Sequence, residues 1–353
     1  MDATTVWRVS VMNTPGRSST ASGQAASPCP FPRLLVLGAH GQVGRELVRS
    51  LAPLGEVIAL TRRPGDHEQG WFADLSDPVG LIQTIERLQP NWVINAAAYT
   101  AVDEAQSASG QLMADRVNHQ SVAALAQCCV RLGAGLVHYS TDYVFNGQGQ
   151  QAWKESDPPQ PVNAYGLSKQ QGEAAVVQAG GKYVVMRTSW VYGLHGNNFA
   201  KTMLRLAMER EQLRVVADQV GAPTSAALLA DLTAHVIRQM DDVSYEVPAH
   251  AENAAVFAHP WSGIYHVCAS GSTSWHGYAQ RVLQWAGAQG WPLKVTADTV
   301  QAIASSEYPT AAPRPLNSRL NTELFVSTFG LCLPDWKHGV IDMLNGLHPS
   351  SLK

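Results

Sequence analysis

Short apolar runs alternate along this chain with longer stretches in which apolar residues recur every three or four positions. The short runs predict buried β-strands at 34–37, 57–60, 92–94, 136–139 and 183–186. The longer stretches predict amphipathic helices, with stripes at Val43, Leu47 and Leu51, at Leu81, Ile85 and Leu88, and at Val122, Leu125 and Cys129. Strands that are apolar throughout and alternate with helices are typical of parallel sheets covered on both faces. The pattern therefore predicts an α/β fold with a Rossmann-type, doubly wound parallel sheet.

This rhythm loosens after about Arg187, where proline and glycine punctuate the chain. We expect a smaller C-terminal substrate-binding lobe here, closing over the carboxyl edge of the sheet, where open α/β sheets bind ligands. The predicted division is an NAD(P)-binding domain over 33–190 and a mainly substrate-binding lobe over 191–348, with some segments returning to the first domain. The stretch from Asp241 to Pro260 is predicted to be a surface excursion.

The first 32 residues are rich in Ser, Thr, Ala, Pro and Gly and show no periodic apolar pattern. They lack the apolar core of a secretory signal, so we interpret 1–32 as a disordered extension or a start codon assigned too early. A transit peptide is the alternative, although no convincing amphipathic helix supports it.

The composition argues against nucleic-acid binding and membrane association. The 353 residues are 45% hydrophobic and 15% charged, with a net charge of -3, which gives no electrostatic reason to expect nucleic acid or an anionic membrane as partner. No apolar run approaches the roughly 20 residues that span a bilayer. The five cysteines form no Cys-x-x-Cys pair and suggest no disulfide framework. The simplest compartment is the cytoplasm.

A glycine-rich turn follows the first predicted strand. Gly38, Gly41 and Gly44 have the Gly-x-x-Gly-x-x-Gly spacing between a strand and a helix. Such a turn brings backbone N–H groups and a helix N-terminus close to a pyrophosphate. The alternative is a turn that serves only close helix–strand packing.

The end of the second predicted strand bears on the choice of cofactor. An acidic residue there would bind the ribose 2′-hydroxyl of NAD, but this chain has Thr61, Arg62 and Arg63. Two guanidinium groups suit a 2′-phosphate, which favours NADPH without excluding NADH; the alternative is a solvated basic loop.

Two later segments also follow apolar runs. Asp74-Leu75 offers a carboxylate to an adenine amino group, although Asp74 is equally suited to cap a turn. Ala96-Ala97-Ala98 after Asn95 is small enough for close approach by a flat cofactor.

The chemistry is carried by Tyr165 and Lys169, which are four residues apart and so share one helix face. A free tyrosine has a pKa of about 10, and we expect the Lys169 ammonium to lower the Tyr165 pKa by stabilising the phenolate. The segment Ser140-Thr141-Asp142, which ends the strand at 136–139, supplies a hydroxyl that would orient a substrate carbonyl. The pair alone is also compatible with an exposed helical pair; the glycine turn and the Thr141 strand end favour catalysis.

At this point the chain resembles the extended short-chain dehydrogenase/reductases, and within them the reductases that complete dTDP-L-rhamnose synthesis. The resemblance extends over roughly Leu34 to Leu347. The matching segments are Gly38 to Gly44, Asn95 to Asp103, His138 to Phe145, Tyr165 to Lys169, Arg187 to Tyr192, Asn197 to Leu204, Asp218 to Thr224 and Arg314 to Leu320.

The resemblance implies reduction of a dTDP-linked 4-keto sugar by NADPH. Tyr165 would donate the proton, and Lys169 would adjust the pKa of Tyr165 and hold the ribose. Thr141 would orient the 4-keto oxygen. The residues that would line the cofactor are Gln42, Val43, Asp74, Leu75, Ala98, Tyr99, Thr100 and Tyr139. Those that would contact the sugar nucleotide are Thr141, Asp142, Trp190, Arg314 and Asn317, with a core aromatic as the alternative for Trp190.

Two departures from the family qualify these expectations. Relatives that use NADH carry an acid where this chain has Thr61. Some relatives dimerise through Mg²⁺ held by glutamates. Glu46 and Glu323 match two of those positions, but Ala227 stands at a third. We therefore do not expect a dimer bridged by metal, and Mg²⁺ bound in another way and a homodimer are the alternatives.

Two other functions fit parts of the pattern. One is a non-catalytic NADP-binding regulatory subunit, which would not need Thr141, Tyr165 and Lys169 together. The other is a related nucleotide-sugar reductase or epimerase, which the segments Asn197 to Leu204 and Arg314 to Leu320 disfavour.

Overall fold

The computed structural model describes residues 31–65, 70–242 and 259–348. The predicted extension at 1–32, apart from its last two residues, and most of the predicted excursion at 241–260 lie outside this part of the chain. Within the described ranges, no helix is long and apolar enough to cross a membrane.

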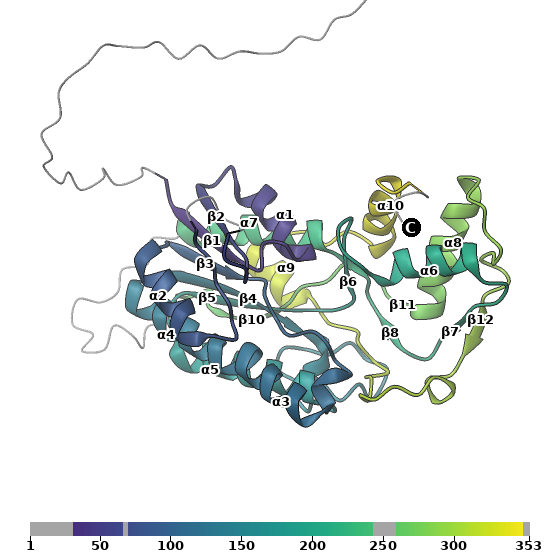
Figure 1. Ribbon diagram of the computed structural model, residues 1–353, viewed down its shortest axis with the longest axis horizontal. Helices are drawn as coiled ribbons and strands as arrows, with labels where there is room; N and C mark the ends of the chain where they lie inside the picture. Colours follow the sequence, from purple (N-terminus) through teal and green to yellow (C-terminus); the bar gives the residue numbers. More distant parts are fainter. Residues whose placement is uncertain (1–30, 66–69, 243–258, 349–353) are drawn as a thin grey trace, which may run out of the picture. The chain divides into compact units, whose positions relative to one another are not determined.

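The central element is a six-stranded parallel sheet (Figure 1). Its strands are β1 (Arg33–Leu37), β2 (Glu56–Leu60), β3 (Trp92–Asn95), β4 (Gly135–Thr141), β5 (Tyr183–Thr188) and β10 (Gly263–His266), in the order β10-β5-β4-β3-β1-β2. All five predicted strands are present, and β10 was not predicted. The chain reverses its winding direction between β1 and β3, which creates a ligand crevice at the carboxyl ends of those strands.

Alternate residues of each strand face opposite layers of helices. Leu34 and Val36 pack against α1 (Gln42–Leu51), α7 (Ala226–Asp242) and α9 (Glu323–Phe329). Leu35 and Leu37 belong to the opposite cluster, which includes α2 (Pro78–Leu88), α4 (Ser121–Leu132) and α5 (Ala164–Ala179). Figure 1 shows these two sets on opposite sides of the sheet. Both faces are thus covered, as the apolar strands predicted.

A third apolar cluster lies away from the sheet, around Tyr192, Tyr278 and Trp336. It joins α6 (Phe199–Glu209), α8 (Trp275–Ala288) and α10 (Trp336–Asn345). Three two-stranded sheets accompany it: β6 (Val191–Tyr192) with β9 (Thr224–Ser225), β7 (Arg214–Val216) with β12 (Gln301–Ile303), and β8 (Val220–Gly221) with β11 (Thr273–Ser274). The remaining elements are α3 (Ala108–Asp115), the π-helical turn η2 (Arg116–Gln120) and the 3-10 turns η1 (Glu104–Gln106), η3 (Asp142–Val144) and η5 (Ser305–Glu307).

Helix α5 is held tightly against its neighbours. A Cβ on Gly166 would lie 2.1 Å from the Tyr143 carbonyl oxygen, and one on Gly172 would lie 2.2 Å from that of Asn118. Only glycine permits both approaches. Glu173 forms a bidentate ion pair with Arg187 of β5, with both side chains 2% exposed. These contacts fix the helix that carries the predicted catalytic pair.

Replacing Arg187 by Met should lower the free energy of unfolding by about 3–5 kcal/mol, because the Glu173 carboxylate would be buried without its partner. Replacing both residues, as Glu173→Leu with Arg187→Met, should recover most of that loss, because no charge then remains buried. Urea denaturation followed by circular dichroism measures both values. A double variant no more stable than the single one would contradict this account.

Candidate active site

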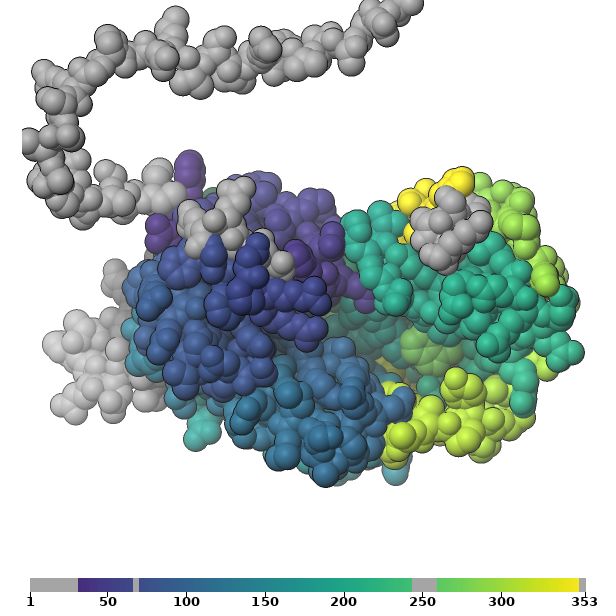
Figure 2. Space-filling view, viewed as in Figure 1, coloured from purple at the N-terminus to yellow at the C-terminus, as the bar shows by residue number. Residues whose placement is uncertain are grey.

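A cleft of about 920 Å³ opens at the carboxyl ends of the sheet strands. The space-filling view shows the surface hollowed where the blue segments meet the teal and green ones (Figure 2). Of the sixteen residues predicted to bind the cofactor, fifteen line it. They are Gly38, Gly41, Gln42, Val43, Thr61, Arg62, Arg63, Asp74, Leu75, Ala98, Tyr99, Thr100, Tyr139, Tyr165 and Lys169. Gly44 is buried and packs under the turn.

The glycine turn is built for an anionic group. Gly38 has a φ of 76°, which favours glycine, and a Cβ on Gly44 would lie 2.1 Å from the Gly38 carbonyl oxygen. Gly41 is the N-cap of α1, no described side chain caps it, and the first turn carries no acidic residue. The helix N-terminus therefore presents backbone N–H groups and positive dipole charge to the cleft, which fits a dinucleotide pyrophosphate.

The basic pair lies at the end of β2. Arg62 and Arg63 are exposed and line the cleft, while Thr61 is buried and its hydroxyl accepts from the Arg63 N–H at 3.3 Å. Asp74 also lines the cleft, and its Oδ1 accepts from the Ser76 N–H at 2.8 Å. Asp74 thus caps a turn and also faces the cleft, and its contact with an adenine amino group stays a prediction.

Tyr165 lies in the first turn of α5, which Asn163 caps by accepting from the Gly166 N–H at 2.8 Å. Burial raises the pKa of the Tyr165 phenol well above its ordinary value, and a hydrogen bond with Thr141 partly opposes this. The predicted lowering of the Tyr165 pKa by Lys169 is therefore wrong for this structure. The phenol is held protonated, as a proton donor requires.

Lys169 is directed toward β4. Its Nζ donates to the Tyr139 carbonyl at 2.6 Å and lies 3.2 Å from His138 Nε2. Burial lowers the Lys169 pKa to about 8, with the Glu173 carboxylate acting in the opposite sense. These bonds explain why the lysine does not stabilise the phenolate as predicted.

Asp142 follows Thr141 at the start of η3 and is buried. Its Oδ1 accepts from the Thr141 hydroxyl at 3.1 Å, and its Oδ2 has no hydrogen-bond partner among the described residues. Burial raises the Asp142 pKa to about 7, opposed by hydrogen bonds with Ser318 and Thr141. A buried carboxyl with unused hydrogen-bonding capacity beside Tyr165 suits a site that binds a polar ligand.

A family model described as the RmlD substrate binding domain matches residues 32–348. The chain belongs to this family. It is 47% identical over 314 residues to dTDP-4-dehydrorhamnose reductase of Escherichia coli K12, covering 89% of this chain and 97% of the relative. Its identity to the Burkholderia thailandensis enzyme of the same name is 46% over 311 residues, covering 87% of this chain and 96% of the relative.

A solved structure agrees. The dTDP-4-dehydrorhamnose reductase of Bacillus anthracis, in complex with NADP, matches with a TM-score of 0.75 and 31% identity, covering 90% of this chain and 100% of that one. These matches confirm the predicted resemblance, the Rossmann-type α/β fold and the assignment of the chain to the dTDP-4-dehydrorhamnose reductases.

Of the five residues predicted to contact the sugar nucleotide in this family, none lines the cleft in the described part of the chain. Thr141 and Asp142 lie beside Tyr165. Trp190 has a φ of 49° and stacks on Trp275 with ring centroids 3.7 Å apart. Their role in substrate binding stays a prediction.

The other two predicted contacts are engaged within the chain. An Arg314 Nη2 pairs with Asp103 Oδ2 at 2.6 Å. Asn317 is buried, donates to the Gln151 carbonyl at 2.6 Å and accepts from the Arg319 guanidinium at 3.0 Å. Asn317 thus holds a loop in place, and its substrate contact also stays a prediction.

Thr188, Asn118 and His138 were not assigned to the site from the sequence, and Ser140 was noted only as part of the strand end. Ser140 and Thr188 line the cleft, and their buried hydroxyls have no hydrogen-bond partner among the described residues. Asn118, on η2, bonds to both backbone groups of Tyr99 and to Ser168 of α5. His138 contacts Lys169. Ser140 and Thr188 stand at strand ends, a signal that was available; the other two carry no spacing pattern.

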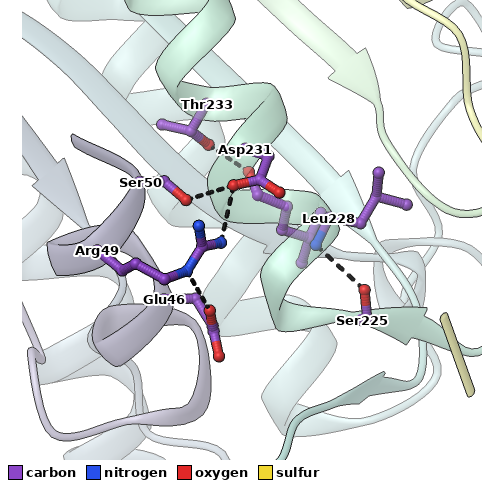
Figure 3. A network of polar contacts seen from close by, with 8 residues as sticks. Glu46, Arg49, Ser50, Ser225, Leu228, Asp231 and Thr233 are labelled. Carbon is purple, nitrogen blue, oxygen red and sulfur yellow. Dashed lines mark hydrogen bonds and ion pairs between the residues drawn. The ribbon is translucent and has the colours of Figure 1, made fainter. Parts of the chain in front are cut away.

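The predicted metal residue Glu46 takes part in a polar network between α1 and α7 (Figure 3). Arg49 bridges Glu46 at 3.0 Å and Asp231 at 2.8 Å, and Ser50 also donates to Asp231. The described residues contain no group of three His, Cys, Asp or Glu side chains that could hold a metal ion. A role of Glu46 and Glu323 in binding Mg²⁺ stays a prediction.

The Asp142→Asn substitution should stabilise the protein at neutral and alkaline pH. The folded-state pKa is raised from 3.8 to about 7, so the folded protein holds this proton more tightly and the natural chain loses stability as pH rises through that window. The full loss corresponds to about 4 kcal/mol. Unfolding free energies at pH 4 and pH 8 should therefore differ less in the variant. Replacing the exposed Asp298 by Asn is the matched control; equal pH slopes for Asp142→Asn and the natural chain would refute this prediction.

Proposed function

We propose that this protein reduces the 4-keto group of dTDP-4-dehydro-β-L-rhamnose to give dTDP-β-L-rhamnose, with NADPH as reductant. The observation that carries the proposal is the placement of Tyr165 and Lys169 in the dinucleotide cleft, with Thr141 hydrogen-bonded to Tyr165. The names of the relatives at 46–47% identity support the substrate.

Each of the three residues has a distinct task. Tyr165 delivers its phenolic proton to the sugar oxygen, and its raised pKa keeps that proton in place until the oxygen becomes negative. When the sugar binds, the Thr141 hydroxyl turns from Asp142 Oδ1 to donate to the carbonyl, which it orients. Lys169 holds the ribose beside the nicotinamide. NADPH, when bound, supplies the hydride to the sugar C4.

The cofactor would be held along the lining of the cleft. The α1 N-terminus with Gln42 and Val43 binds the pyrophosphate. Arg62 and Arg63 bind the 2′-phosphate. The adenine and the remaining surface are bounded by Asp74, Leu75, Ala98, Tyr99, Thr100 and Tyr139. The NADP in the Bacillus anthracis relative supports this class of ligand.

The sugar nucleotide would contact Thr141, Asp142 and Trp190, with Arg314 and Asn317 near its phosphates or base. Residues 33–190 would form the NAD(P)-binding domain and 191–348 the main part of the substrate lobe. The α7, β10 and α9 segments would then be the parts that return to the first domain.

The direct test is oxidation of NADPH and NADH in parallel, with the keto-sugar generated in situ from dTDP-glucose. We expect consumption of NADPH that depends on the sugar. No consumption of either cofactor would sink the proposed reaction.

The Tyr165→Phe variant should lose turnover by several orders of magnitude, because no other residue is proposed to deliver the proton, while NADPH binding stays nearly intact. Steady-state kinetics and fluorescence titration of NADPH measure the two effects. Tyr143→Phe is the matched control, since its ring packs edge-on against Tyr165 at 5.8 Å but does not line the cleft. Equal losses in the two variants would rule out the assigned role.

Replacing Arg62 and Arg63 by Ser should raise the KM for NADPH by roughly 10–100-fold, as expected for losing a hydrogen bond between charged groups. The KM for NADH should change little, because NADH has no 2′-phosphate. Initial rates with both cofactors measure the ratio. Arg131→Ser serves as the control, because Arg131 lies on α4 in an exposed pair with Glu86 of α2. A loss of NADH affinity equal to that of NADPH would count against a 2′-phosphate site.

A further inference from the structure

Lys169 is the end of a buried hydrogen-bond chain that the proposed reaction does not use. Its Nζ lies 3.2 Å from His138 Nε2, and His138 Nδ1 lies 3.1 Å from Asn95 Nδ2. Asn95 Oδ1 accepts from the Ala97 N–H at 3.2 Å. Asn95, His138 and Lys169 are all nearly inaccessible to solvent, so water does not replace these bonds. The chain runs from the floor of the cleft at Ala97 to the lysine beside Tyr165.

The direction of every bond in this chain follows from its first member. Because the Ala97 N–H can only donate, Asn95 presents its oxygen to Ala97 and its NH₂ group to His138. His138 Nδ1 must then accept, which places the proton of a neutral imidazole on Nε2. That Nε2–H points at Lys169. An ammonium has no lone pair to receive it, whereas a neutral amine does.

We infer that His138 is a positioning residue that selects the charge of Lys169: in the arrangement observed, its Nε2–H donates to the lone pair of a neutral Lys169 amine. Lys169 becomes an ammonium when the chain reverses, with His138 protonated on Nδ1 and Asn95 turned so that its oxygen accepts. Reversal releases the N–H of Ala97, a residue that lines the cleft. The inference assigns a purpose to Lys169 charge and so rests on the proposed function.

The charged groups around Lys169 are consistent with this balance. On its own helix it faces Tyr165 and Glu173, and Glu173 is already neutralised by Arg187 of β5. From β4 it faces His138, whose own pKa is lowered well below its ordinary value by burial and by Lys169. The imidazole therefore stays neutral. It acts on Lys169 through the direction of its hydrogen bond and not through a second positive charge.

The test is a direct titration of Lys169. The chain has seven lysines, so ¹³C labelling of the lysine side chains and NMR can follow Lys169 as the signal missing from Lys169→Met. Asn95→Asp supplies acceptors to both Ala97 and His138 Nδ1, which frees Nε2 to accept from an ammonium. His138→Gln removes the fixed donor. Both variants should raise the Lys169 pKa by at least about 1 unit.

The matched control is His266→Gln. His266 is an equally buried histidine that bonds to Trp153 and lies near Arg187 rather than Lys169. It should leave the Lys169 titration unchanged. An unchanged or lowered Lys169 pKa in Asn95→Asp overturns the inference, and that variant decides alone if His138→Gln does not fold.

The same variants separate this inference from the proposed function. If both hold, the alkaline limb of the kcat/KM–pH profile for the keto-sugar moves upward together with the NMR titration. A shifted titration without activity on the sugar would keep the role of His138 and reject the reaction. Activity on the sugar with an unshifted Lys169 titration would keep the proposed reaction and reject the role of His138.

Discussion

The buried ion pair between Glu173 and Arg187 is the contact on which the geometry of the active site depends. Tyr165, Lys169 and Glu173 are spaced by four residues, so they lie on one face of α5. The ion pair of Glu173 fixes the direction in which that face points. Arg187 binds Glu173 bidentately from β5 and packs its guanidinium 5.1 Å from the Phe145 ring. A helix rotated away from the sheet would bury both charges without partners. The cost of that rotation keeps the phenol and the amine at the cleft.

The site moves the pKa values of its ionisable groups toward their neutral forms. Burial raises the pKa of Tyr165 and Asp142 and lowers that of Lys169, so each group favours its neutral form more than it would in water. Burying these groups lowers the stability of the fold. The apolar clusters on both sides of the sheet offset this loss. Ionisable groups in a buried site respond strongly when a ligand brings charge, because little solvent screens the interaction.

Much of this could be predicted from the sequence because it follows from local pattern. The strands are apolar throughout, and residues after successive parallel strands gather at one edge, which explains why fifteen predicted cofactor residues share one cleft. Strand β10 escaped prediction because its four residues, Gly263–His266, contain only a two-residue apolar run. The Tyr165 pKa was predicted in the wrong direction because helical spacing shows that Lys169 is near, but not that its Nζ bonds to β4 instead.

Strand β4 shows why that last detail needed the structure. Successive side chains of a strand face opposite sides, so His138 reaches Lys169 on α5 while the Tyr139 hydroxyl reaches Thr233 of α7 at 2.6 Å. The Tyr139 backbone carbonyl remains free to accept from Lys169 at 2.6 Å. One strand thus offers the lysine an imidazole from one residue and a carbonyl from the next. A carbonyl exists at every position and leaves no mark in a sequence, so the position of Lys169 depends on backbone register, which only the fold determines.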